Sequence, residues 1–184
     1  MSETSNTHIQ IRHAIIDDVP AIAAIHVRAW QTAYRGIMTD DFLESLTAEQ
    51  RIPTWTRFVE DPASQMTVLV ATEAGKPTLL GFCSVCPRRD SEAPATVGEI
   101  YTLYVDPDRK GAGIGKALLA AGERSLREAG FTSATLWMLR DNAPSRAFYG
   151  RCGWRADGGT RTQPYGDLDI AECRLAKSLV DAGD

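Results

Sequence analysis

The sequence predicts one domain of mixed α/β class around a central, largely antiparallel sheet. Three strand-like segments, 67–73, 79–86 and 97–105, follow one another without an intervening helix, which favours antiparallel neighbours. Two amphipathic helical segments follow, separated by a further strand, and two strand-like segments close the chain. A length of 184 residues suits one domain with a sizeable core.

The first half of the chain opens with a strand and two helical regions. Residues 8–14 alternate polar and apolar side chains, as a half-buried strand does. The aspartates at 17–18 can cap a helix with Pro20 in its first turn. That helix carries one apolar face, formed by Ile22, Ile25, His26 and Ala29. Thr39 or Asp40 opens a second helical region, in which the segment 47–60 carries Ile52, Trp55 and Val59 at helical spacing.

The second half alternates helices and strands. Residues 114–129 carry an apolar stripe at helical spacing, 133–139 form a strand, and 143–152 form a short helix. Two last strands, 154–163 and 167–176, are joined by a turn at Pro164-Tyr165-Gly166. The predicted order is β α α β β β α β α β β, a sheet of about seven strands with four helices.

Composition excludes several classes of protein. The longest apolar runs, at 21–25 and 117–121, are far too short to span a bilayer. Residues 1–7 are polar and show no secretory signal, and four cysteines fit a reducing compartment, so a cytoplasmic location is expected.

The charge is unevenly distributed along the chain. The net charge of −4 argues against nucleic acid as a partner. Within 108–161, however, ten basic residues stand against five acidic ones. This excess indicates either a small polyanionic ligand or an ordinary solvated surface.

A glycine-rich loop at Lys110–Gly115 lies between a strand and a helix. Glycines let backbone N–H groups converge on an anion, and the N-terminus of the helix adds partial positive charge, so the loop predicts a pyrophosphate site. Dinucleotide-binding and Walker patterns both fail here, because Lys116, Ala117 and Leu118 occupy positions where those patterns need other residues.

The spacing Lys110-x-x-Gly113-x-Gly115 resembles the Gln/Arg-x-x-Gly-x-Gly/Ala loop of the GNAT superfamily of N-acetyltransferases. The surrounding segments LYVDPDRKGAGIGKALL (103–119) and RDNAPSRAFYGRCGW (140–154) resemble that superfamily as well. The resemblance extends from about residue 8 to about residue 176. Lys110 departs from the usual Gln or Arg; it keeps the charge of Arg but lacks the guanidinium fork.

The resemblance implies a single N-acetyltransferase domain at 7–177 with flexible termini at 1–6 and 178–184. It implies acetyl-CoA (coenzyme A) as co-substrate and no metal. The main chain of Leu103, Tyr104 and Val105 is expected to pair with the pantetheine arm, and Asn142 to hydrogen-bond that arm, cap a helix, or do both. The pyrophosphate is expected at the loop formed by Lys110, Gly111, Ala112, Gly113, Ile114, Gly115 and Lys116.

Two side chains are candidates for catalysis by the same resemblance. Acyl transfer needs a base, because a lysine-like amine has a pKa of about 10.4 and is protonated at neutral pH. Glu99 matches the glutamate base of the histone-acetylating branch, acting through water; the alternative is a salt-bridged carboxylate. Tyr149 matches the tyrosine that protonates the departing thiolate; the alternative is a packing role. A strand N–H near Leu103 or Tyr104 is expected to stabilise the oxyanion.

Other residues give weaker indications. Trp30, Tyr34 and Trp55 belong to the helical region that covers the acceptor in this superfamily, although aromatic residues at helical spacing are also typical of a core. Cys83 and Cys86 point to opposite faces of a strand and are interpreted as buried thiols rather than zinc ligands. Acidic side chains hint at a cationic acceptor or form a solvated helical face: Asp40, Asp41, Glu44, Glu49, Glu60 and Asp61.

The predicted activity is transfer of an acetyl group from acetyl-CoA to a primary amine of a small molecule, peptide or protein, by direct attack in a ternary complex. A CoA-binding sensor without turnover, another acyl group, or an O-acceptor are the alternatives. No nucleic-acid or membrane partner is expected. The sequence leaves the oligomeric state open, with a homodimer as one possibility.

Overall fold

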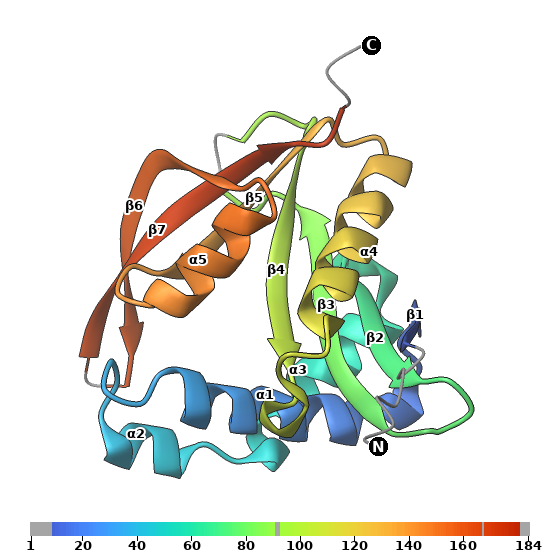
Figure 1. Ribbon diagram of the computed structural model, residues 1–184, viewed down its shortest axis with the longest axis vertical. Coiled ribbons are helices and arrows are strands. Elements are labelled where there is room, and N and C mark those ends of the chain that lie inside the picture. The colour runs from blue at the N-terminus through green and yellow to red at the C-terminus, as the bar shows by residue number, and fades with distance from the viewer. Residues whose placement is uncertain (1–8, 91–92, 167, 181–184) are drawn as a thin grey trace, which may run out of the picture.

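A computed structural model describes residues 9–90, 93–166 and 168–180 (Figure 1). In these ranges seven strands form one sheet in the order β1-β2-β3-β4-β5-β7-β6, and of its six neighbouring pairs β4–β5 is the parallel one. The strands are β1 (Ile9–His13), β2 (Thr67–Glu73), β3 (Leu79–Pro87), β4 (Val97–Val105), β5 (Ser133–Leu139), β6 (Arg155–Tyr165) and β7 (Leu168–Ser178). The predicted mixed, largely antiparallel sheet is confirmed.

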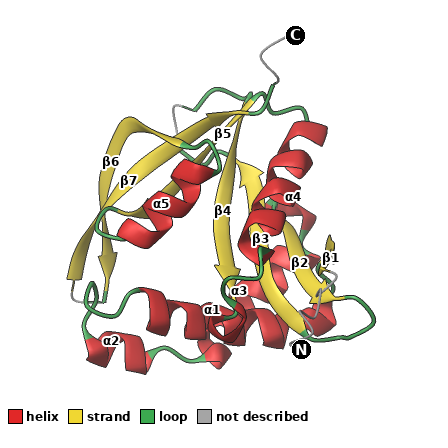
Figure 2. Ribbon diagram, viewed as in Figure 1, coloured by secondary structure: helices red, strands yellow, loops and turns green. Residues whose placement is uncertain are grey.

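Helices lie on both faces of this sheet (Figure 2). The α-helices in the described ranges are α1 (Val19–Ala33), α2 (Asp40–Ser45), α3 (Ala48–Glu60), α4 (Ile114–Glu128) and α5 (Ala143–Arg151). Short 3-10 helices lie at Ile16–Asp18, Pro62–Ser64 and Pro107–Arg109. Hydrophobic contacts place α4 and α5 against one face and α1 and α3 against the other.

The second predicted helical region is divided into α2 and α3. Leu46 adopts an extended conformation (φ −75°, ψ 127°), which ends α2. The side chain of Gln50 then accepts a hydrogen bond from the Thr47 N–H at 3.2 Å, so a new helix begins. The chain therefore has one more helix in its described part than the order predicted.

The start of α1 differs from the predicted aspartate cap. The Asp18 carboxylate is bound by the Arg12 guanidinium at 2.6 and 2.9 Å and accepts the Ile15 N–H at 2.9 Å. It therefore stabilises the turn before α1 and makes no side-chain cap on α1 itself. Thr39, in contrast, caps α2 as expected, with its hydroxyl accepting the Phe42 N–H at 3.3 Å.

Each face of the sheet has its own hydrophobic core. On the α4 side, Leu118, Leu119 and Leu126 are fully buried against the sheet. On the α1 side, Ile22 and Trp55 pack with residues of β2 and β3. Burial of one such side chain contributes roughly 1.5–3 kcal/mol, so these two cores fix the helices to the sheet.

The sheet opens between its two parallel strands. β4 and β5 pair only between 97–99 and 133–135, and β4 spreads away from the other half of the sheet below that point (Figure 1). Residues 101–105 are consequently half-exposed although β4 lies in the middle of the sheet. The β3–β4 register also shifts so that Ser84 faces Thr102 and Val85 faces Ile100, which leaves Tyr101 as a bulge residue.

The C-terminal end of the described chain is more ordered than predicted. β7 continues to Ser178, and Leu179 is buried while its N–H bonds to the Thr132 carbonyl at 2.9 Å. The expected flexible residues 1–6 and 181–184 lie outside the described residues. No helix in the described ranges is long and apolar enough to cross a membrane.

Candidate active site

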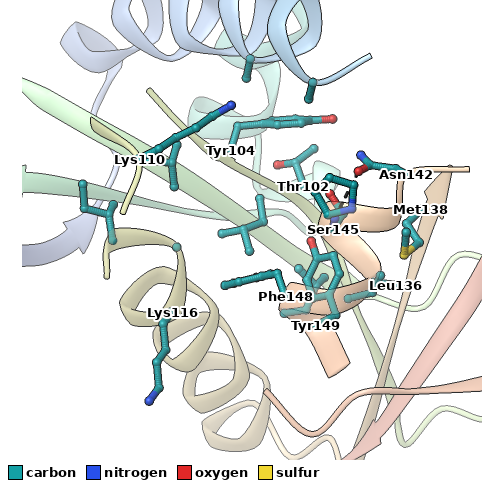
Figure 3. Close-up of a pocket in the computed structure, with 18 of the residues that line it drawn as sticks. Thr102, Tyr104, Lys110, Lys116, Leu136, Met138, Asn142, Ser145, Phe148 and Tyr149 are labelled. Carbon is teal, nitrogen blue, oxygen red and sulfur yellow. Dashed lines mark hydrogen bonds between the residues drawn. The ribbon is translucent and has the colours of Figure 1, made fainter. Parts of the chain in front are cut away.

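A cavity of about 620 Å³ occupies the opening between β4 and β5 on the α4 side (Figure 3). It is lined by β4, by the loop that leads into α4, and by α5. The predicted cofactor-binding residues line it, apart from Ala112: Leu103, Tyr104, Val105, Lys110, Gly111, Gly113, Ile114, Gly115, Lys116 and Asn142. Residues from three separate stretches of the sequence (103–105, 110–116 and 142) therefore meet in one place.

The glycine loop has the backbone geometry of an anion cradle. Gly111 and Gly113 adopt φ values of 87° and 77°, in the left-handed region that favours glycine. Gly113 is the N-cap of α4 and supplies no capping side chain, so N–H groups of the first helical turn have no acceptor within the helix. A Cβ atom at either glycine would meet nothing within 4 Å, so the space in front of the loop is open.

The charge of this cavity is positive. Its lining includes Arg109, Lys110, Lys116 and Arg151, and none of the described residues that line it is acidic. The Lys116 side chain extends away from the other labelled residues, whereas Lys110 extends toward Tyr104 (Figure 3). These features fit a pyrophosphate group, because N–H donors, a helix N-terminus and basic side chains converge there.

The edge of β4 provides a second binding element. Residues 100–105 pair with β3 on one side, but their backbone groups on the other side have no strand beside them. An extended ligand with amide groups can add to such an edge as a strand would. The Asn142 side chain points into the same space (Figure 3), and its Oδ1 accepts the Ser145 N–H at 3.1 Å. Asn142 is therefore a helix cap, which leaves its amide N–H groups for a ligand.

Tyr149 projects from α5 into the cavity (Figure 3). Its ring packs against Phe148 and Trp154, and none of the described residues hydrogen-bonds its hydroxyl. Burial raises the pKa of this phenol above its ordinary value, so the group holds its proton throughout the physiological range. A protonated and unpaired phenol is suited to proton donation.

A second cavity of about 470 Å³ lies on the α1 side of the same opening. Residues that line both cavities connect them through the gap between β4 and β5: Tyr34, Tyr101, Thr102, Tyr104, Trp137, Met138 and Leu139. The Arg28 guanidinium helps to hold α1 over this gap, because it pairs with Asp106 at 2.6 Å, just after β4. A ligand in the first cavity and a ligand in the second can therefore come into contact in the gap between β4 and β5.

Glu99 lies in the second cavity, at the point where β4 and β5 separate. Its side chain is buried, and its carboxylate accepts the Arg89 N–H at 3.2 Å and lies 3.8 Å from the Arg89 guanidinium. Burial raises the pKa of Glu99 above its ordinary value, which makes it a stronger base than an exposed glutamate. Its position in the cavity is compatible with the role of a base, and its contact with Arg89 is compatible with the role of an ion-paired carboxylate.

The predicted acceptor-binding residues Trp30, Tyr34 and Trp55 all line the second cavity. Trp30 Nε1 donates to the Tyr104 hydroxyl at 2.8 Å, which ties α1 to β4. Trp55 is almost fully buried and donates to His26 Nδ1 at 3.1 Å, so it belongs to both the core and the cavity wall. Core packing and a position in the cavity wall, the two alternatives for these aromatic residues, therefore do not exclude each other.

Several residues of the second cavity were missed by the sequence analysis: Arg51, Arg89, Trp137, Arg161 and Glu172. They come from five different parts of the chain and form no motif. Arg161 pairs with Glu172 at 2.6 Å, and Glu172 also accepts the Tyr165 hydroxyl at 2.8 Å. No sequence signal points to this set, because only folding brings it together.

The acidic residues that hinted at a cationic acceptor lie elsewhere. None of them lines either cavity: Asp40, Asp41, Glu44, Glu49, Glu60 and Asp61. Cys83 packs near Gly122 of α4, and Cys86 lies on the Glu99 side of the sheet, so the two point to opposite faces. Burial raises the pKa of both thiols to about 12, which keeps them protonated and unreactive.

The sequence and the fold match known proteins. The family model described as "Acetyltransferase (GNAT) family" matches residues 25–154. An uncharacterized N-acetyltransferase, YuaI, from Bacillus subtilis is 36% identical over 77% of this chain and 77% of its own length. A spermidine N(1)-acetyltransferase from Thermoplasma acidophilum is 24% identical over 81% of this chain and 89% of its own length.

Solved structures share the fold. PaiA N-acetyltransferase from Thermoplasma acidophilum, solved in complex with coenzyme A, superposes with a TM-score of 0.73 at 22% identity, covering 92% of this chain and 98% of that one. A ribosomal-protein-alanine N-acetyltransferase from Brucella melitensis gives 0.70 at 27% identity, covering 92% and 99%.

The chain belongs to the acetyltransferase (GNAT) family, as the family match and the Bacillus relative show. It is an acyl-CoA-dependent N-acyltransferase, and the resemblance read from the glycine loop is confirmed.

Proposed function

We propose that this enzyme transfers an acetyl group from acetyl-CoA to a primary amine of a small molecule or peptide by direct attack, with both substrates bound together. The observation that carries this proposal is the meeting of two cavities at the β4–β5 opening. One has the charge and backbone donors for a polyanion, and the other contains a buried carboxylate. We place the whole activity in the single domain at 7–177.

The residues on the α4 side hold the co-substrate. Backbone N–H groups of the 110–116 loop bind the pyrophosphate, and the free edge of β4 at Leu103–Val105 pairs with the amides of the pantetheine arm. The Asn142 amide donates a further hydrogen bond. Bound acetyl-CoA supplies the acetyl group as an activated thioester. This arrangement positions the thioester carbonyl at the gap that leads to the second cavity.

Two side chains handle the protons. Glu99, on the acceptor side, takes a proton from the ammonium through a water, since its raised pKa brings it closer to that of an amine. A β4 N–H near Leu103 or Tyr104 stabilises the negative oxygen that develops at the carbonyl. Tyr149, on the opposite side, gives its proton to the departing sulfur. Base and acid therefore flank the reacting carbonyl from the two cavities.

A thiol-release assay tests this function. Acetyl-, propionyl- and succinyl-CoA are offered with polyamines, aminoglycosides, amino acids, alcohols and peptide N-termini, and the product is identified by mass spectrometry. We expect acetyl-CoA to be preferred and the product to be an amide. Calorimetric binding of CoA without release of thiol by any acceptor would instead identify a sensor, and ester formation would identify an O-acceptor.

A further inference from the structure

Three buried side-chain nitrogens in the described part of the chain lack a hydrogen-bond partner, and all three residues line the second cavity. The atoms are Nε of Arg51, Nε2 of His26 and Nε1 of Trp137. Buried polar groups are nearly always hydrogen-bonded, so a cluster of unpaired ones in a single cavity points to a polar ligand.

All three atoms are donors. The Arg51 guanidinium and the Trp137 indole carry hydrogen on these nitrogens and accept nothing. His26 Nδ1 accepts a hydrogen bond from Trp55, and burial together with the nearby Arg51 charge lowers the pKa of His26 to about 3. The imidazole is therefore neutral, and its single proton is on Nε2. The matching ligand presents oxygen acceptors.

The charges in this cavity indicate that the ligand with oxygen acceptors is an anion. Arg161 is paired with Glu172 and Arg89 with Glu99, whereas no carboxylate of the described residues lies within 4.0 Å of Arg51. The Arg51 guanidinium lies 5.5 Å from the centre of the Trp30 ring, which holds it at the cavity wall. An uncompensated positive charge in a cavity with two further unpaired donors attracts an anion and repels a polycation.

We propose that the acceptor is a small amine that also carries a carboxylate, as an amino acid does. Arg51 and His26, from α3 and α1, bind the carboxylate, while the amine extends toward Glu99 at the β4–β5 opening. Trp137, on β5, donates to a further oxygen of the acceptor. This inference rests on the proposed function, because it names the substrate class of the same site.

Matched pairs of substrates test the inference. Each standard amino acid is compared with the amine that remains when its α-carboxyl group is removed, for example leucine with 3-methylbutylamine, and spermidine represents polycations. We expect the preferred amino acid to exceed its decarboxylated partner by at least about 10-fold in kcat/KM, the effect of one charged hydrogen bond. A preference for spermidine or for the decarboxylated amines would overturn the inference.

Variants of one helix separate recognition from structure. Arg51→Met is expected to raise KM for the preferred amino acid about 10- to 100-fold and to lower kcat/KM for its decarboxylated partner by a much smaller factor. Arg51→Lys keeps the charge and is expected to recover part of the loss. Arg57→Met is the matched control, because Arg57 is exposed on the same α3 and lines neither cavity. Equal losses for both substrates in Arg51→Met would contradict the proposal.

Binding is measured apart from turnover. Calorimetry of amino acids into the CoA-bound protein is expected to show binding that Arg51→Met weakens and Arg57→Met does not. If no amine is acetylated but this Arg51-dependent binding is found, the proposed function fails, whereas the recognition of a carboxylate by Arg51 stands. If amines are acetylated without any dependence on a carboxylate or on Arg51, the inference fails and the proposed function stands.

Discussion

The two cavities at the β4–β5 opening are built in opposite ways. The first cavity, in which we propose that CoA binds, depends mainly on backbone: a free strand edge, two glycines with positive φ, and the first turn of α4, all within residues 100–116. The acceptor-side cavity depends on side chains from α1, α3, β4, β5, β6 and β7 and from the β3–β4 connection.

This difference determines which amino-acid substitutions each cavity tolerates. A backbone site restricts only those residues whose conformation the loop needs, and the group that we propose it binds is common to every acyl-CoA. A side-chain site is altered by any substitution in its lining, so acceptor choice can change while the fold and the co-substrate stay the same.

Gly113→Val is expected to weaken acetyl-CoA binding by about 100-fold or more. A β-branched residue is strained at φ 77°, so the cradle changes shape, and its side chain occupies the space in front of the loop. Gly75→Val is the matched control, because Gly75 has the same φ of 77° and equally open surroundings but lies in the turn between β2 and β3. Calorimetry in which both variants bind CoA like the wild type would remove the loop from the site.

Tyr149→Phe is expected to lower kcat by about 100-fold, within the usual range for general acid catalysis, with little change in CoA affinity. Stability should be retained, because the hydroxyl has no hydrogen-bond partner in the described residues to lose. Steady-state kinetics and calorimetry together check this. A weaker CoA affinity with an unchanged kcat would show that Tyr149 only packs beside the co-substrate.

Glu99→Gln is expected to lower kcat/KM by about 10-fold or more at low pH and less as pH rises, since free amine becomes abundant. The wild-type free energy of unfolding should also depend on pH, and it should fall as pH rises. A carboxyl with a raised folded pKa binds more protons when folded, so the wild-type free energy of unfolding falls as pH rises from about 4.3 through the folded pKa. The variant lacks this loss.

Glu73→Gln is the matched control for both measurements. Glu73 is also a strand glutamate, at the end of β2, but it pairs with the exposed Lys76 and lies outside both cavities. Urea denaturation at several pH values and pH–rate profiles should separate the two variants. Identical profiles for Glu99→Gln and the wild type would leave free amine from solution as the nucleophile, with no protein base.

Asn142 gives the smallest effect and tests a residue with two roles. Asn142→Ala is expected to lower the free energy of unfolding by about 1 kcal/mol, because the α5 cap is lost. Asn142→Asp keeps a capping oxygen and removes the amide donors. If Asn142 also binds the pantetheine arm, both variants lose CoA affinity by a few-fold. If Asn142 is only a helix cap, the one expected effect is the loss of stability in Asn142→Ala.

The elements whose conformation depends on residues adjacent in the chain could be predicted from the sequence. Alternation and turn residues gave β2, β4 and β5 with the bounds that the structure has, and the Lys110–Gly115 loop predicted its cavity because glycine, helix start and preceding strand are adjacent in the chain. The division of α2 from α3 was missed, since it depends on the conformation of one residue, Leu46.

The lining of the second cavity could not be predicted in this way. In a regular strand Glu99 and Tyr104, five residues apart, would point to opposite faces, but the bulge at Tyr101 places both in one cavity. Arg51, Trp137 and Glu172 are far apart in sequence, and no periodicity relates them. Their meeting follows from which helix packs on which face and from where β5 leaves β4, and those are properties of long-range packing.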